Sequence, residues 1–206
     1  MNLPNKLTCL RMLLVPVFVV VAYLPIYKTV GDFIPLKHII LLAIFCAASF
    51  TDYLDGHIAR KRKMVTTFGK FLDPIADKLL VLAALLVLVE FRTIPAWIVI
   101  VMEGRELLVA ASRMLQAKKG NVVAASMFGK VKTVSQMIAI ILALLAYSPF
   151  YAFFGGPNSL DFTAGEQPQF ILNILMSIAM TVAIITSILS GMQYVLASKD
   201  EILQSK

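Results

Sequence analysis

Six long runs of mainly apolar residues dominate the chain, and short polar breaks separate them. A helix needs about 20 mainly apolar residues to cross the hydrocarbon core of a bilayer, and each run meets that length within a few residues. The pattern predicts an all-α, polytopic membrane protein with six transmembrane helices over Leu10–Tyr27, His38–Arg60, Phe68–Glu90, Ile94–Leu115, Ser126–Tyr147 and Phe170–Ala197.

The segment before the first run, Met1–Leu10, carries leucines on one helical face, so a short interfacial helix is expected there. The first run lacks a small-x-small cleavage site and is therefore predicted to be a retained helix and not a signal peptide. The sequence contains no repeat or low-complexity tract, which predicts a single domain over residues 1–206.

The composition also favours a membrane protein, with 59% hydrophobic and 15% charged residues and a mean hydropathy of +0.84. Soluble globular domains are about 45–50% apolar and about 25% charged. A soluble protein of this size lacks the interior to bury such a surplus, so lipid must surround much of the surface. Cys9 and Cys46 are interpreted as small hydrophobic residues, because a disulfide framework or a zinc site needs more ligands.

The net charge of +7 would fit a nucleic-acid partner, but its distribution along the chain favours a membrane. If both termini are cytoplasmic, 16 of the 19 Lys and Arg residues fall on the cytoplasmic side, and only Lys28, Lys37 and Arg92 fall on the other. The positive-inside rule then predicts a multi-pass protein of the cell membrane with both ends in the cytoplasm. Nucleic acid is not expected as a partner.

Four aspartates lie within or at the ends of the second and third runs, where a carboxylate costs about 2.5–3.5 kcal/mol at mid-bilayer. Asp52 and Asp55 are spaced i, i+3, and Asp73 and Asp77 are spaced i, i+4, so each pair shares a helical face. Two divalent cations would balance four carboxylates, and oxygen ligands favour Mg²⁺ or Mn²⁺. Such paired-metal sites serve phosphoryl transfer. The alternative is that the acids form ordinary ion pairs between helices.

Small residues continue both acidic faces. Gly56 and Ala59 follow Asp55, and Gly69 lies one turn before Asp73. A glycine inside a helix costs about 1 kcal/mol relative to alanine. Either these residues let a ligand approach the backbone closely, or they permit tight helix packing in the membrane.

The combined pattern is Asp52-x-x-Asp55-Gly56-x-x-Ala59-Arg60, then eight intervening residues, then Gly69-x-x-x-Asp73-x-x-x-Asp77. It resembles the signature of the CDP-alcohol phosphotransferase family at every defined position, spacing included. Members of that family transfer a phospho-alcohol group from a CDP-linked donor to an acceptor hydroxyl and release CMP. The resemblance implies that the four aspartates hold two divalent metals, that Asp77 is also the catalytic base, and that CDP is bound by Gly56, Ala59, Arg60 and Gly69.

Three further segments are similar to bacterial phosphatidylglycerophosphate synthases, a branch of this family. They are Asn2–Thr8 with Arg11, Gly104–Leu107 with Arg113, and Gly129–Thr133 with Gln136 and Met137. The similarity covers roughly residues 2–140, and nothing beyond residue 147 is diagnostic. It implies phosphatidyl transfer from CDP-diacylglycerol to glycerol 3-phosphate, giving phosphatidylglycerol phosphate and CMP, by a homodimer in phospholipid biosynthesis.

Basic residues within the fourth and fifth runs are candidates for binding the acceptor phosphate. Arg105 and Arg113 are eight residues apart, close to one face of a helix, and Lys130 lies near the start of the next run. Charges at this depth need compensation, and arginine can bind a phosphate through two parallel hydrogen bonds. Alternatively, Arg113 and Lys130 extend to the interface, while Arg105 pairs with Glu103 or Glu106.

Two other functions fit parts of the pattern. A sister enzyme would use the same metal site with another acceptor, namely phosphatidylglycerol (giving cardiolipin), serine or inositol phosphate. A divalent-cation transporter would use the aspartates as an ion path. It predicts acids spread through the membrane depth, whereas these four cluster near one side.

Overall fold

The computed structural model describes the backbone of residues 3–30, 34–62, 67–118, 127–146, 150 and 167–197. Within these ranges, the side chains at 3–7, 30, 52–74, 115–118, 167–170 and 197 are not described. The chain forms two compact units. Unit 1 comprises residues 1–93 with 143–147, and unit 2 comprises residues 94–142 with 148–206.

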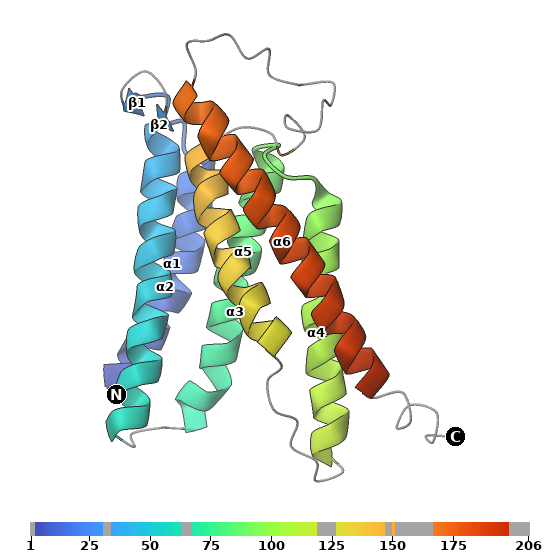
Figure 1. Cartoon of the computed structure of the whole chain (residues 1–206). Helices are drawn as coiled ribbons and strands as arrows, with labels where there is room; N and C mark the ends of the chain where they lie inside the picture. Colours follow the sequence, from blue (N-terminus) through green and yellow to red (C-terminus); the bar gives the residue numbers. More distant parts are fainter. Residues whose placement is uncertain are drawn as a thin grey trace. The chain divides into compact units, whose positions relative to one another are not determined.

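Six long α-helices and one short strand pair make up the described residues (Figure 1). The helices are α1 (Leu3–Tyr23), α2 (Leu36–Arg62), α3 (Thr67–Glu90), α4 (Ala96–Lys118), α5 (Met127–Ala146) and α6 (Gln167–Ala197). The strands β1 (Thr29–Val30) and β2 (Ile34–Pro35) pair antiparallel, with Thr29 opposite Pro35. The predicted helical fold class is confirmed, since strands of two residues do not alter it.

Prolines mark several of the helix ends. Helix α1 ends two residues before Pro25, while α2 and α4 begin directly after Pro35 and Pro95. Proline lacks an N–H group and disfavours helical geometry in the residue before it, so it is common at helix boundaries. The observed helices therefore agree with the predicted runs to within about one turn at every end except the start of α1.

The separate interfacial helix predicted over Met1–Leu10 is not formed, because residues from Leu3 onward are the first turns of α1. Pro4 lies in the first turn of that helix, where a missing N–H removes no intrahelical hydrogen bond. Neither glycine nor proline occurs between Asn5 and Val15, so nothing in the sequence interrupts the helix. Leucines on one face do not by themselves define a helix boundary.

A Schellman motif closes the C-terminal end of α3. The amide of Thr93 donates to the carbonyl oxygen of Leu88, and the amide of Arg92 donates to that of Val89, both at 2.9 Å. Arg92 has a φ of 58°, in the left-handed region that usually falls to glycine in this motif. The helix thus ends at a defined residue, although its last turn is followed by neither glycine nor an adjacent proline.

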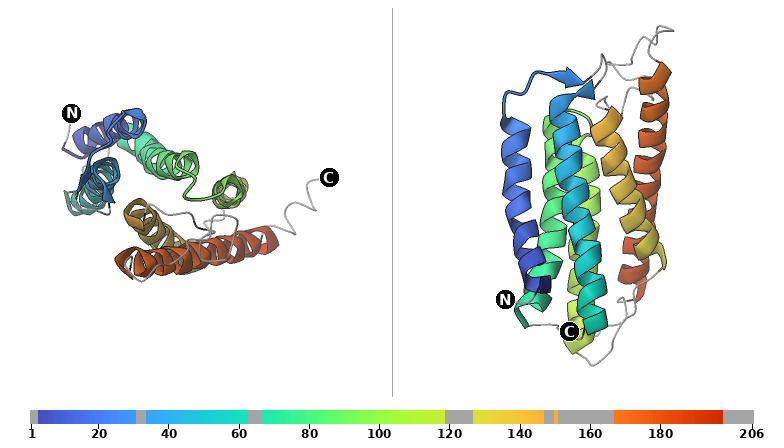
Figure 2. Two further views of the ribbon diagram at one scale, coloured as in Figure 1. Left: turned by 90° about the horizontal axis from the view of Figure 1, so that it is seen from above. Right: turned by 90° about the vertical axis from the view of Figure 1, so that its left-hand side faces the viewer.

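In unit 1, α1 packs against both α2 and α3 (Figure 2). The buried side chains include Phe18 of α1, Phe45 of α2 and Leu80 of α3, together with alanines of α2 and α3. Small side chains let helices approach closely, which matters in lipid because the hydrophobic effect does not drive helices together there. The last turn of α5 belongs to the same unit, where Nδ1 of His38 lies 3.1 Å from the carbonyl oxygen of Leu144.

In unit 2, α4 packs against α6, and the surface of α6 is the inverse of that of a water-soluble helix. Its described exposed positions are apolar apart from Gln193, whereas Asn173, Ser177, Ser187 and Ser190 are buried. A helix in water would show the opposite arrangement. Polar residues that face neighbouring helices, with apolar residues outward, are typical of a helix in lipid.

Two helical segments among the described residues are long and apolar enough to cross a membrane, namely Met127–Ala146 and Ile171–Leu196. Helix α4 has 23 residues, but charged side chains, including Arg105 and Glu106, interrupt its apolar sequence. Together with the outward apolar face of α6, these segments agree with the membrane protein that the composition predicts.

Phe45 and Phe50 lie on the same helix, α2, but Phe45 is 0% exposed and Phe50 is 61% exposed. We expect Phe45→Ala to lower the free energy of unfolding by about 3–5 kcal/mol through the cavity that it leaves. The matched variant Phe50→Ala should change it by about 0.5 kcal/mol or less. Denaturant unfolding of both variants in one detergent measures the difference, and equal losses would contradict the packing of unit 1.

Candidate active site

The acidic signature lies on two consecutive helices of unit 1. Asp52 and Asp55 fall in the second half of α2, and Asp73 and Asp77 fall in the first three turns of α3. The end of α2 and the start of α3 lie at the same end of this unit (Figure 1), and the two helices are in contact. Because both helices are unbroken through these residues, each pair shares a helical face.

The other signature residues lie on the same two helices. Gly56, Ala59 and Arg60 fall in the last two turns of α2, and Gly69 falls in the first turn of α3. The side chain of Asp77 is described and exposed. The remaining side chains of the signature lie outside the described residues, so their contacts rest on the sequence and the helix positions alone.

The spacing of the acids fits two divalent cations. Residues three and four apart on a helix differ by about 4.5 and 6 Å in axial rise. Carboxylates at such separations suit two cations about 3.5–4 Å apart, as in paired-metal sites. Four carboxylates also match the hard oxygen ligands that Mg²⁺ and Mn²⁺ prefer.

A buried ion cluster joins α4 and α5 in unit 2. Arg105 donates through Nη1 to Oε1 of Glu106 at 2.8 Å, and Nζ of Lys132 donates to the same oxygen at 2.6 Å. Arg105 also donates through Nη2 to the hydroxyl of Ser190 on α6. Arg105 and Lys132 are 8% and 3% exposed, so both cations are buried, whereas the Glu106 side chain that they share is 21% exposed. Of the two glutamates expected near Arg105, Glu106 makes the ion pair.

Lys132, which sequence reasoning did not single out, enters this cluster, whereas Lys130 is exposed on α5. The helical spacing of α5 could have predicted that Lys132 is buried. Gln136 and Ala139 are buried, and counting back one turn from Gln136 reaches Lys132 on the same face. Lys130 lies about half a turn away from that face.

Arg113 is held by a different residue of α6. Its Nη2 donates to the hydroxyl of Tyr194 at 2.8 Å, and its guanidinium carbon lies 5.3 Å from the centroid of the same ring, a cation–π distance. The side chain of Arg113 is exposed, and that of Tyr194 is buried. Both arginines of α4 therefore contact α6, a helix in which the sequence shows no motif.

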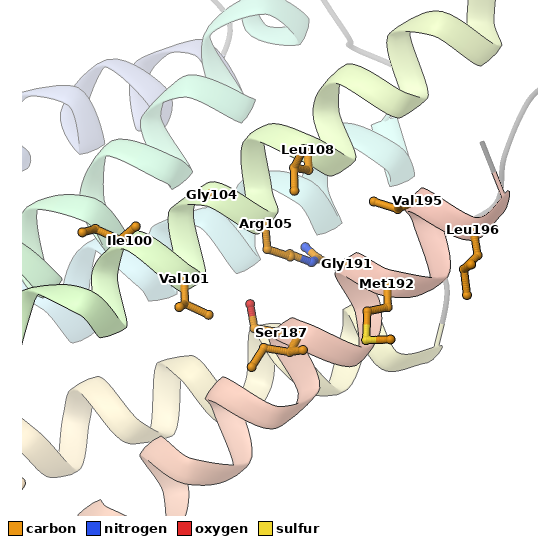
Figure 3. A pocket seen from close by; sticks show the side chains of 11 residues that line it. Ile100, Val101, Gly104, Arg105, Leu108, Ser187, Gly191, Met192, Val195 and Leu196 are labelled. Carbon is orange, nitrogen blue, oxygen red and sulfur yellow. The ribbon is translucent and has the colours of Figure 1, made fainter. Parts of the chain in front are cut away.

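A groove of about 490 Å³ runs between α4 and α6 beside the ion cluster (Figure 3). Its lining is apolar apart from Arg105 and Ser187, and Arg105 extends across it toward Gly191 (Figure 3). A Cβ atom on Gly191 would lie 3.2 Å from Cγ of Arg105, whereas a Cβ atom on Gly104 would meet nothing within 4 Å. The position of the arginine stem thus depends on glycine at 191 and not on glycine at 104.

Comparison with known sequences matches the CDP-alcohol phosphatidyltransferase family over residues 1–189, a range that contains the acidic signature and the ion pairs of Glu106. A protein of Bacillus subtilis (strain 168) with the name CDP-diacylglycerol--glycerol-3-phosphate 3-phosphatidyltransferase is 50% identical over 153 residues, 72% of this chain and 79% of the relative. Proteins of the same name from Haemophilus influenzae (strain ATCC 51907 / DSM 11121 / KW20 / Rd) and Escherichia coli (strain K12) are 42% and 41% identical. Each match covers 72% of this chain and 78% of the relative. The resemblance of the aspartate signature is thereby confirmed, and the chain belongs to the CDP-alcohol phosphatidyltransferase family.

Proposed function

We propose that the protein transfers the phosphatidyl group of CDP-diacylglycerol to glycerol 3-phosphate, giving phosphatidylglycerol phosphate and CMP. The observation that carries this proposal is the 50% identity to a relative whose name states that reaction. In the transfer, the oxygen of an acceptor hydroxyl forms a bond to the phosphorus that carries the diacylglycerol. The bond from that phosphorus to CMP breaks, and the hydroxyl loses its proton.

Positive charge on α4 and α5 supports an anionic acceptor. Arg105 and Arg113 lie on one helix and are both held by contacts to α6, and Lys130 lies near the start of α5. We assign these three residues to the acceptor phosphate. A planar guanidinium offers two parallel hydrogen bonds to a phosphate, and fixing it in advance lowers the entropic cost of binding.

The acidic signature is assigned to the metals and the proton. Asp52, Asp55, Asp73 and Asp77 would hold two divalent ions, Mg²⁺ or Mn²⁺, which when bound would neutralise charge on the pyrophosphate and on the departing CMP. Asp77 would also accept the proton of the acceptor hydroxyl, as a general base. Its exposed side chain is consistent with access to a substrate.

The nucleotide of the donor is assigned to the small residues beside the acids. Gly56, Ala59 and Gly69 would let the nucleotide approach the helix backbones, and Arg60 would lie near its phosphates. All four residues fall within one to two turns of an aspartate on the same helix.

We also infer a single domain that crosses the cell membrane six times, with both termini and the active site on the cytoplasmic side. The distribution of basic residues, 16 of 19 on one side, supports this orientation. Glycerol 3-phosphate and CMP are water-soluble, so an active site that faces the cytoplasm exchanges both directly. The functional form is proposed to be a homodimer.

The choice of acceptor is tested with purified protein, CDP-diacylglycerol and four labelled acceptors, namely glycerol 3-phosphate, phosphatidylglycerol, serine and inositol phosphate. We expect glycerol 3-phosphate alone to be used, with one CMP released per lipid product. Preference for another acceptor would assign the protein to a sister activity. Metal flux into sealed vesicles without any CDP-lipid would favour the transporter hypothesis.

Metal removal should abolish turnover. EDTA is expected to stop CMP release, and Mg²⁺ or Mn²⁺ should restore it, because four carboxylates at this spacing repel one another without cations. Binding of Mn²⁺, followed by electron paramagnetic resonance, should give two ions per chain in the wild type and fewer in Asp52→Ala. Unchanged turnover in EDTA would contradict the two-metal assignment.

Arg113→Ala should raise the KM for glycerol 3-phosphate about 10- to 100-fold, the effect of one lost charge-assisted hydrogen bond. The KM for CDP-diacylglycerol should change little. Arg113→Lys should recover only part of the loss, because a point charge replaces a planar fork. Full recovery with lysine would mean that Arg113 extends to the interface and does not grip the acceptor.

A further inference from the structure

We propose that Glu106 is a positioning residue for the acceptor phosphate, and that it holds Arg105 and Lys132 as a pair that binds this phosphate together. The inference rests on the proposed function and adds two residues to the acceptor site. Glu106 acts through the two cations and does not itself bind the substrate.

The charge balance of the cluster points to a missing anion. Among the described contacts, the two buried cations Arg105 and Lys132 share one partly buried carboxylate, Glu106, so two positive charges meet one negative charge. An uncompensated buried charge is costly. Among the described residues, the buried Nε of Arg105 also has no hydrogen-bond partner. A phosphate group would supply both the negative charge and an acceptor for this N–H.

The geometry brings the two cations within reach of a single phosphate. One oxygen of Glu106 accepts from Nη1 of Arg105 at 2.8 Å and from Nζ of Lys132 at 2.6 Å. Nη1 of Arg105 and Nζ of Lys132 therefore lie close together, because both are hydrogen-bonded to the same oxygen, and one phosphate can reach both. Ser190 accepts from the second terminal nitrogen of Arg105, so the guanidinium is fixed on two edges and leaves Nε for a ligand.

A purely structural role is the alternative, since the same ion pairs also link α4 to α5. The two roles differ in what happens when both charges are removed together. Glu106→Gln leaves two buried cations without a counter-charge, and Lys132→Met leaves Arg105 paired with Glu106. The double variant leaves Arg105 as its only charge, so it keeps the net charge of the wild type.

The experiment measures melting temperature and the KM for both substrates in Glu106→Gln, Lys132→Met and the double variant. We expect each single variant to raise the KM for glycerol 3-phosphate about 10- to 100-fold, with little change in the KM for CDP-diacylglycerol. The double variant should melt closer to the wild type than Glu106→Gln does, yet keep the raised KM. Recovery of both quantities together would overturn the proposal and leave a structural ion pair.

Glu103→Gln is the matched control, because it removes the same charge from α4 one turn away, while the ion pairs described for Arg105 and Lys132 are both made by Glu106. Its KM for glycerol 3-phosphate should equal that of the wild type. A loss as large as that of Glu106→Gln would show a general charge effect and overturn the proposal.

Inorganic phosphate gives a readout that needs no turnover. It should raise the melting temperature of the wild type, because a ligand that binds the folded state stabilises it, and the shift should be lost in Lys132→Met. If the shift is seen but glycerol 3-phosphate is not an acceptor, the proposed function fails while the anion site stands. If glycerol 3-phosphate is used but Lys132→Met keeps both the shift and the normal KM, the proposal about Glu106 and Lys132 fails alone.

Discussion

Charged groups that leave water must find their compensation inside the protein, because lipid offers neither counter-charges nor hydrogen bonds. In unit 2 this constraint is met at Glu106, whose single oxygen receives two cations from two different helices. Helix α6 completes the arrangement from its buried face, with Ser190 on Arg105 and Tyr194 on Arg113. The three helices are therefore joined by polar contacts as well as by buried apolar side chains, among them Met102, Ile140 and Met180.

In unit 1 the signature acids lie toward one end of α2 and α3, and the unit also buries a charged side chain, Arg11 of α1, which is 0% exposed. Most of α1, α2 and α3 associate through apolar and small side chains, among them Phe18, Phe45 and Ala76, which are fully buried. The four aspartates of the signature are confined to the end of α2 and the start of α3. The cost of the carboxylates is thus confined to two segments of the chain.

Much of this fold could be predicted from the sequence because apolar runs of about 20 residues have few alternatives to a spanning helix. The starts of α2 and α4, directly after Pro35 and Pro95, were predicted to within two residues, whereas the first helix was predicted to run through Pro25 to Tyr27 and ends at Tyr23. The residue at which α3 ends was predictable, but the backbone conformation that closes the helix was not. Arg92 adopts a left-handed conformation that its residue type does not indicate. The start of α1 was predicted wrongly because an amphipathic segment and a spanning segment can share one uninterrupted helix.

The site shows a sharper limit of sequence reasoning. A motif fixes residue types and spacing within one stretch of chain, so the aspartates on α2 and α3 could be recognised together. The hydrogen-bond partners of Arg105 and Arg113 on α6 lie 85 and 81 residues away in the sequence. No local sequence pattern around Ser190 or Tyr194 predicts these contacts. Lys132 is intermediate, because helical spacing alone separates it from its exposed neighbour Lys130.

Gly191 shows how a residue without any polar side-chain atom can influence the chemistry of such a protein. The closest atom to its missing side chain is Cγ of Arg105, at 3.2 Å, so the space available at position 191 limits where the side chain of Arg105 can lie. A larger residue there would turn the arginine while leaving every charge, every ion pair and the whole aspartate signature in place. The volume of a residue on a helix that contributes no signature residue can therefore set the position of a charged side chain on its neighbour.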